Sequence, residues 1–293
     1  MNMAATTMDK TDATTALKDL LEGYTTEVTA RDRKSLDAAG DLLPAGAEVF
    51  IASIPGDSAD RLVAAAAQLR RAGLTPVPHI VARNTKSRAE LEDTIQRLVG
   101  EAALDRALVL GGDRDKPEGE FDSSLQLIET GVFQRNNIRK ISIACYPEGH
   151  PRVADEVLEA ARAEKLVAAD AAGLDVTLVS QFCFDAKPII AMAARMRALG
   201  VKQPYRVGVA GPAERATLIK YALMCGVGAS MRALKERQDL AKSVLTGETP
   251  EALLREVAVA QAANPALGIS GVHFFTFGAL GKSARFAQDL LAG

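Results

Sequence analysis

The residues best suited to chemistry are polar side chains that lie inside or directly after apolar, β-rich runs. In chain order they are Glu27, Ser53, His79, Asp113, Tyr146, His150 and Gln181. A carboxylic acid in such a setting can move a proton, and imidazole, amide and hydroxyl groups can bind and orient a ligand. Burying any of these groups is costly unless it finds partners, so together they predict one shared pocket.

Each of these residues also has a purely structural interpretation. Glu27 could be a solvated edge carboxylate, and His79 could be a core histidine bonded to a carbonyl. Asp113 and His150 could be ordinary turn residues, and His273, inside an apolar run, is interpreted as structural. The joint pattern, rather than any one residue, favours a functional site.

Two familiar kinds of site are not predicted. The chain has three histidines, far apart and without an HxH or HxxxH pair, so no metal site is expected. It also has no GxSxG motif or Ser/His/Asp signature. The glycine pair Gly111-Gly112, directly before Asp113, is too short to be a phosphate loop by itself, although its backbone N–H groups could meet a ligand phosphate.

Eight β-rich runs alternate with long helical stretches along the chain. The predicted strands are Tyr24–Ala30, Ala47–Ser53, Thr75–Val81, Arg106–Gly111, Lys140–Tyr146, Asp175–Phe182, Tyr205–Ala210 and Gly271–Phe277. Several are continuously apolar, which is typical of parallel strands covered on both faces. Eight strand–helix units in a chain of this length predict a (β/α)8 TIM barrel, in which the polar residues above would share the carboxyl-end rim.

The same pattern predicts one domain over residues 1–293, with residues 1–12 flexible and an extra helix at 14–21. Additional helices are expected between the seventh and eighth strands, around 229–245 and 250–262. An open, doubly wound sheet is the structural alternative. The turn after the first strand, Arg31-Asp32-Arg33-Lys34, lacks the GxGxxG of that fold, which favours the barrel.

Composition excludes several partners. The formal net charge of -2, the absence of Trp and an aromatic content of 4% argue against nucleic-acid binding. No apolar run is long enough to span a bilayer, and the Thr-rich start does not read as a secretory signal. The cysteines, Cys145, Cys183 and Cys225, are interpreted as inert thiols, so we expect a cytoplasmic protein. Homo-oligomers are possible.

Three motifs carry a resemblance to a known family. They are Cys145–Pro151 (CYPEGHP), Val179–Asp185 (VSQFCFD) and Gly271–Thr276 (GVHFFT). In order and position they resemble the AYPExHP, TQxxFD and hFYT runs of the methylenetetrahydrofolate reductase family. Weaker matches lie at Glu27, at Pro78-His79 and at Gly111-Gly112-Asp113. The resemblance runs from about Tyr24 to the end and covers the catalytic barrel.

This resemblance implies roles for individual residues. It implies that Glu27 is the general acid and that Asp113 hydrogen-bonds the folate near the flavin. Gln181 would contact the pterin, and Tyr221 would stack on substrate unless it is simply a core aromatic. Residues expected at the FAD site are Ser53, His79, Gly111, Gly112, Asp113, Tyr146 and His150. The implied reaction moves hydride from NADH or NADPH through FAD to 5,10-methylenetetrahydrofolate, giving 5-methyltetrahydrofolate by ping-pong kinetics.

The sequence also departs from the family pattern. Gly112 stands where the family has Arg, and residues 166–173 lack the Lys that the family usually has shortly before its sixth strand. No basic residue follows directly after Phe277, although Lys282 or Arg285 could substitute. Two alternatives stay open, and the missing Arg and Lys favour the first. One is a flavin-free reductase of the same family. The other is a non-catalytic folate-binding module that serves a methyl-transfer partner.

Overall fold

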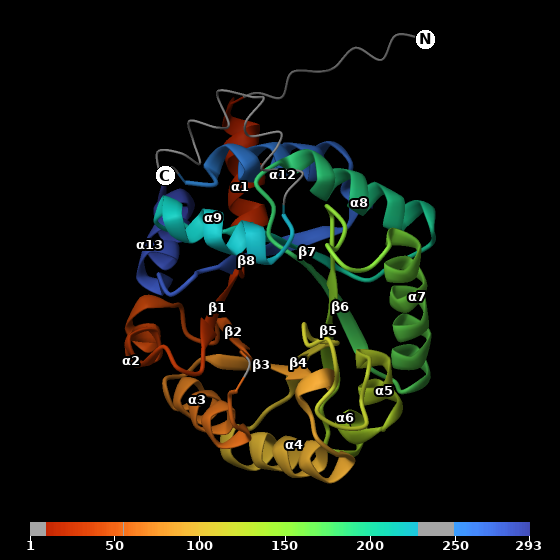
Figure 1. The fold of residues 1–293 in the computed structure, drawn as a ribbon. Helices are drawn as coiled ribbons and strands as arrows, with labels where there is room; N and C mark the ends of the chain where they lie inside the picture. Colours follow the sequence, from red (N-terminus) through yellow and green to blue (C-terminus); the bar gives the residue numbers. More distant parts are fainter. Residues whose placement is uncertain (1–9, 55, 228–248) are drawn as a thin grey trace.

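Figure 1 shows a closed barrel of strands inside a ring of helices, in a computed structural model that describes residues 10–54, 56–227 and 249–293. The strands are β1 Thr25–Thr29, β2 Glu48–Ala52, β3 Thr75–Val81, β4 Arg106–Leu110, β5 Lys140–Cys145, β6 Asp175–Ser180, β7 Tyr205–Ala210 and β8 Ile269–Phe275. Each pairs in parallel with the next, and β8 pairs with β1. The predicted TIM barrel is therefore confirmed, with every strand boundary within two residues of its prediction.

Helices follow the strands around the outside of the barrel. They are α1 Lys10–Leu21, α2 Arg33–Leu42, α3 Ala59–Arg71, α4 Arg88–Ala102, α5 Ser124–Glu129, α6 Val132–Arg135, α7 Asp155–Ala171, α8 Ala186–Ala198, α9 Arg215–Met224, α12 Glu251–Ala263 and α13 Leu280–Ala292, with 3₁₀ turns η1 Ala82–Asn84 and η2 Pro265–Leu267. Local capping sets their ends: the Ser87 hydroxyl accepts the Glu90 N–H at the start of α4. None of the helices in the described parts of the chain is long and apolar enough to cross a membrane.

The extra helices agree with the predictions where the structure describes them. The N-terminal helix α1 begins at Lys10, four residues before the predicted start and within the segment expected to be flexible. It packs against α12, α13 and β8. Between β7 and β8, α12 matches the predicted helix at 250–262, whereas the helix expected at 229–245 lies outside the described residues.

Two apolar layers hold the barrel together. The larger lies between strands and helices and includes Val28, Ile51 and Ile80. The smaller fills the barrel interior with Phe50, Val77, Leu108 and Val179, with Leu110 packed against them. Because side chains alternate along a strand, Glu27, which is in register with Phe50, and His79, two residues after Val77, face this interior.

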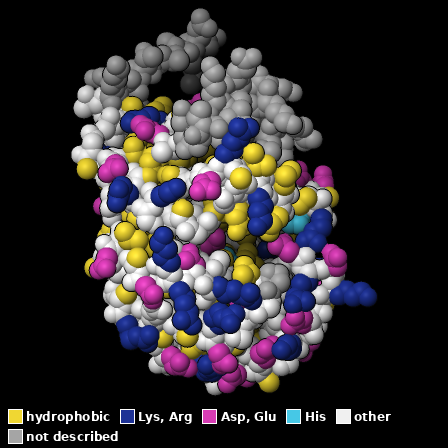
Figure 2. Space-filling model, turned by 60° about the vertical axis from the view of Figure 1, so that its left-hand side comes forward, with side chains coloured by type: hydrophobic (Ala, Val, Ile, Leu, Met, Phe, Trp, Pro, Cys, Tyr) yellow, Lys and Arg dark blue, Asp and Glu magenta, His cyan; other side chains and the backbone are white. Residues whose placement is uncertain are grey.

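Charge on the surface is mixed in sign. On the face drawn in Figure 2, dark-blue cationic and magenta acidic side chains are interspersed among apolar ones, without a continuous patch of one sign. At the amino-end of the barrel, Arg106 pairs with Glu48 and Asp105. The opposite, carboxyl-end rim carries the candidate site.

Candidate active site

The centre of the site is a carboxyl–imidazole contact inside the barrel. Glu27 of β1 and His79 of β3 approach across β2, with 3.6 Å between Glu27 Oε2 and His79 Nε2. Their side chains are only 16% and 10% exposed, respectively. The sequence predicted both residues for the site, and the structure brings them together.

Burial decides the charge of this pair. It raises the pKa of Glu27 to about 8 and lowers the pKa of His79 to about 3. Near neutral pH the carboxyl is therefore mostly protonated and the imidazole is neutral. A carboxylic acid that keeps its proton until pH 8 is suited to general-acid catalysis.

Phe50 packs against this pair from the barrel interior, and His273 lies next to Phe50. The Phe50 ring lies edge-on to His79 with 6.3 Å between centroids, and it also contacts His273 at 4.5 Å. His273 Nδ1 lies 2.8 Å from the Thr25 hydroxyl, and burial lowers its pKa well below the usual value. The buried, hydrogen-bonded setting of His273 agrees with its structural interpretation.

A second polar group lies on the rim after β4 and β5. Tyr146 and His150 contact edge to face at 5.1 Å, and burial raises the pKa of Tyr146 to about 12. The charge of Asp113 acts on both: it adds to the rise for Tyr146, and it opposes the lowering of the His150 pKa by burial. The structure thus groups three predicted residues at one part of the rim.

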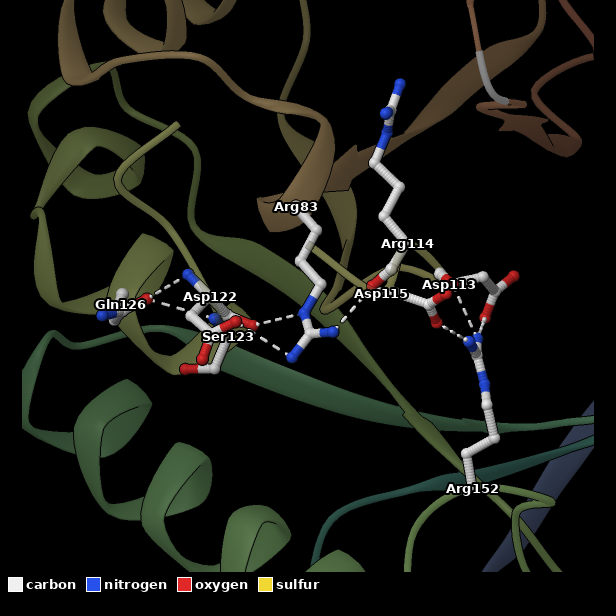
Figure 3. A network of polar contacts seen from close by, with 8 residues as sticks. All are labelled: Arg83, Asp113, Arg114, Asp115, Asp122, Ser123, Gln126 and Arg152. Atoms are coloured by element: carbon white, nitrogen blue, oxygen red, sulfur yellow. Dashed lines mark hydrogen bonds and ion pairs between the residues drawn. The ribbon is translucent and has the colours of Figure 1, made fainter. Parts of the chain in front are cut away.

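Arginines fasten the loop that carries Asp113. Figure 3 shows Arg152 reaching from the loop after β5 to Asp113 and Asp115, with 2.7 Å to the Asp113 carbonyl and 2.9 Å to the Asp115 carboxylate. On the other side, Arg83 donates to the backbone carbonyls of Arg114 and Asp122. Backbone hydrogen bonds and ion pairs both hold the loop, and the Asp113 carboxylate, 3.6 Å from Arg152, remains 90% exposed.

The turn that leads into this loop requires glycine. Gly112 has a φ of +102°, and a Cβ there would lie 2.6 Å from Val81 Cγ1. Gly111 is partly buried and has open space where a Cβ would lie. Ser53, directly after β2, is also partly buried. The carboxyl ends of β2 and β4 place all three on the same rim as Asp113.

Aromatic residues form the rim near β6 and β8. Tyr221 on α9 stacks on Phe277 with 4.6 Å between ring centroids, and Phe277 contacts Phe182 at 5.2 Å. Both Tyr221 and Phe277 remain partly exposed. Phe277 adopts a φ of +51°, a conformation that is strained for a side chain of this kind. Tyr221 therefore packs against another aromatic ring, and part of its side chain is exposed.

Gln181 and Cys225 lie at the ends of β6 and α9, respectively. Gln181 directly follows β6, and its Oε1 accepts the Phe182 N–H at 3.0 Å. At the end of α9, burial raises the pKa of the Cys225 thiol to about 11, and the carboxyl groups of Asp113 and Glu27 add to the rise.

A cavity beside this rim holds cationic residues that sequence reasoning missed. It has a volume of about 180 Å³, lies between α7 and α8, and reaches Tyr146. Arg162 is 6% exposed and its Nε has no hydrogen-bond partner among the described residues. Burial lowers the pKa of neighbouring Lys165, while Glu159 is shared between Arg162 (3.8 Å) and Arg195 (2.5 Å). Excess positive charge with an unused donor suits an anionic ligand.

The fold is a TIM barrel, and the candidate site lies at the carboxyl ends of its strands. A family model described as methylenetetrahydrofolate reductase matches residues 36–283. The chain therefore belongs to the methylenetetrahydrofolate reductase family, as its motifs indicated.

A solved structure of another enzyme shares the barrel architecture. Dihydropteroate synthase (FolP) from Thermus thermophilus superposes with a TM-score of 0.52 at 14% identity, covering 94% of this chain and 95% of that one, and this likeness confirms the fold. The same enzyme in complex with 6HMPPP gives a TM-score of 0.49 at 14% identity, with 94% and 95% coverage. At this identity the likeness extends to the fold alone.

Proposed function

We propose that the protein reduces 5,10-methylenetetrahydrofolate to 5-methyltetrahydrofolate with NADH or NADPH, through FAD and by alternating occupancy of one site. The observation that carries this proposal is Glu27, a buried carboxylic acid that stays protonated to about pH 8 within a barrel of the methylenetetrahydrofolate reductase family. Folate-related one-carbon reduction is the chemistry of this family.

Glu27 supplies the proton that the reaction needs. Opening the methylene bridge of the substrate breaks a carbon–nitrogen bond. The departing nitrogen takes the electron pair of that bond and needs a proton, while the methylene carbon is left as an iminium that accepts hydride. A neutral carboxyl provides it and becomes carboxylate, and solvent returns the proton afterwards. Asp113 and Gln181, at the rim, would accept from and donate to the pterin edge, and Tyr221 would stack on a ring of the substrate.

A dinucleotide flavin would lie along the rim, with its phosphates at the neighbouring cavity. FAD supplies hydride transfer, which no side chain can perform. Arg162 and Lys165 would hold its phosphates, because the unpartnered Arg162 Nε and the partly desolvated Lys165 both gain from a nearby anion. Tyr146, His150, Ser53 and the backbone of Gly111-Gly112 would contact the rest of the cofactor, whereas His79, also expected there from the sequence, lies against Glu27 inside the barrel. Lys165, which lines the cavity, would take the place of the Lys that the family usually has before its sixth strand and that residues 166–173 lack.

The test separates the two half-reactions under anaerobic conditions. Wild-type protein should oxidise NAD(P)H with added FAD, and the reduced protein should then convert methylenetetrahydrofolate. Glu27→Gln should slow the folate half-reaction by about 10²- to 10⁴-fold, the usual contribution of a general acid, and leave nicotinamide oxidation within a few-fold. Equal loss of both half-reactions would refute the role of Glu27.

A second candidate is a flavin-free reductase of the same family, favoured by Gly112, where the family pattern has Arg. Purified protein that lacks flavin absorbance and turns over at the same rate with or without FAD would support it. A third possibility is a folate-binding module without catalysis. In that case titration would show methyltetrahydrofolate binding while neither half-reaction occurred.

A further inference from the structure

His79 faces the acid rather than the outer rim. Its ring lies inside the barrel, 9% exposed, and Phe50 packs edge-on against it. Its Nε2 has no hydrogen-bond partner among the residues that the structure describes. The nearest acidic atom is Glu27 Oε2, at 3.6 Å. A buried ring nitrogen without a partner is costly, so this placement requires an explanation.

The protonated carboxyl of Glu27 needs a hydrogen-bond acceptor, and His79 has one. A protonated carboxyl has one O–H donor, and a neutral imidazole has one nitrogen that accepts. His273 on β8 uses its Nδ1 for the Thr25 hydroxyl, and among the described residues only His79 lies within ion-pair distance of the Glu27 carboxyl. On α9, the Cys225 thiol stays protonated because burial raises its pKa to about 11. β2 presents Phe50, which has no polar atom in its side chain. Among the described residues, His79 Nε2 is the acceptor placed to receive the Glu27 proton.

We propose that His79 is a positioning residue: its Nε2 accepts the Glu27 O–H, which orients the acid and keeps it protonated until substrate arrives. The contact of 3.6 Å shortens to a hydrogen bond when the site closes around ligands, as catalytic contacts commonly do. Acceptance at Nε2 fixes the tautomer with the proton on Nδ1. The imidazole stays neutral throughout, and the proton passes from Glu27 to the substrate nitrogen. The expected effect on kinetics rests on the proposed function. The expected effect on the pKa of Glu27 does not, and it can be measured in the protein without substrate.

The decisive measurement is the pKa of Glu27 in variants of His79. Carbon-13 NMR of glutamate-labelled protein reports the carboxyl titration, and Glu27→Gln assigns the signal. His79→Asn removes the acceptor at the Nε2 position, and we expect the pKa of Glu27 to fall by about half a unit to one unit, the worth of one hydrogen bond. His79→Gln, whose amide reaches the Nε2 position, should keep most of the shift. This pair is a matched control for changes in packing.

Kinetics provide the second readout. The folate half-reaction should lose activity at lower pH in His79→Asn than in the wild type, by the same half to one unit, with partial rescue in His79→Gln. FAD affinity and nicotinamide oxidation should change less than about threefold, since a positioning role acts on the proton alone.

Three outcomes would overturn the proposal. A rise in the pKa of Glu27 in His79→Asn would mean that the imidazole stabilises the carboxylate instead. An unchanged pKa in both variants would mean a structural role, and a fall in FAD affinity matching the loss of activity would make His79 a cofactor residue. If the wild type does not reduce methylenetetrahydrofolate, the proposed function fails, but the NMR titration still decides the role of His79.

Discussion

Glu27 is predicted to cost the protein stability at neutral pH. Its pKa rises from 4.5 to about 8 on folding, a shift of about 3.5 units. Between these values the folded state binds a proton that the unfolded state releases, so the free energy of unfolding falls as pH rises from about 4.5 to 8. At about 1.4 kcal/mol per unit, the full penalty approaches 5 kcal/mol above pH 8 and is about 3 kcal/mol at pH 7. Below pH 4.5 the penalty disappears.

Glu27→Gln tests this reasoning because the amide is neutral at every pH. The variant should be more stable than the wild type by about 3 kcal/mol at pH 7, with no gain near pH 4, while losing folate reduction. Urea unfolding at several pH values between 4 and 8.5 measures the difference. Burial also lowers the pKa of His79 from 6.5 to about 3. Below pH 6.5 the unfolded state therefore binds a proton at His79 that the folded state does not, which lowers the free energy of unfolding as the pH falls. That contribution is present in both proteins and cancels in their difference.

The matched control is Glu129→Gln, which removes the same charge from an exposed position in α5. It should change the free energy of unfolding by less than about 0.5 kcal/mol, without a pH trend. If Glu27→Gln gives a constant difference across the pH range, or destabilises the protein at pH 8, then Glu27 is ionised in the folded state and the argument for a general acid is refuted.

Single contacts underlie three further predictions. Arg162→Met should weaken FAD binding by about 10- to 100-fold in a fluorescence titration, because a buried charged donor to phosphate is lost; unchanged affinity would remove the cavity from the cofactor site. Arg152→Ala should raise the KM for methylenetetrahydrofolate by up to about fivefold with little change in kcat, because the exposed contacts that hold the Asp113 loop are lost. A fall in kcat without a change in KM would contradict this prediction. Gly112→Ala should lower the free energy of unfolding by about 1–3 kcal/mol in urea, since it forces a side chain into a positive φ and against Val81; wild-type stability would show that the turn relaxes.

The sequence alone was sufficient to predict the barrel. Strands such as β3 and β7 match their predicted ranges residue for residue, because runs rich in apolar residues, bounded by turns, mark parallel strands covered on both faces. Their number and spacing then determine closure, and closure places every carboxyl end on one rim. For this reason Glu27, Asp113 and Gln181 could be assigned to one region without coordinates.

Only the tertiary structure decided which polar groups interact. Glu27 and His79 lie on strands separated by β2, and their contact depends on the curvature of the barrel, which no local pattern encodes. Arg162 and Lys165 belong to a charged helix that reads as a solvated face, and they become a candidate anion site because α7 and α8 enclose them. The charge state of Glu27 is likewise set by burial, a property of the whole fold. Local sequence patterns specify elements and their order, whereas proximity and desolvation arise only when the elements are assembled.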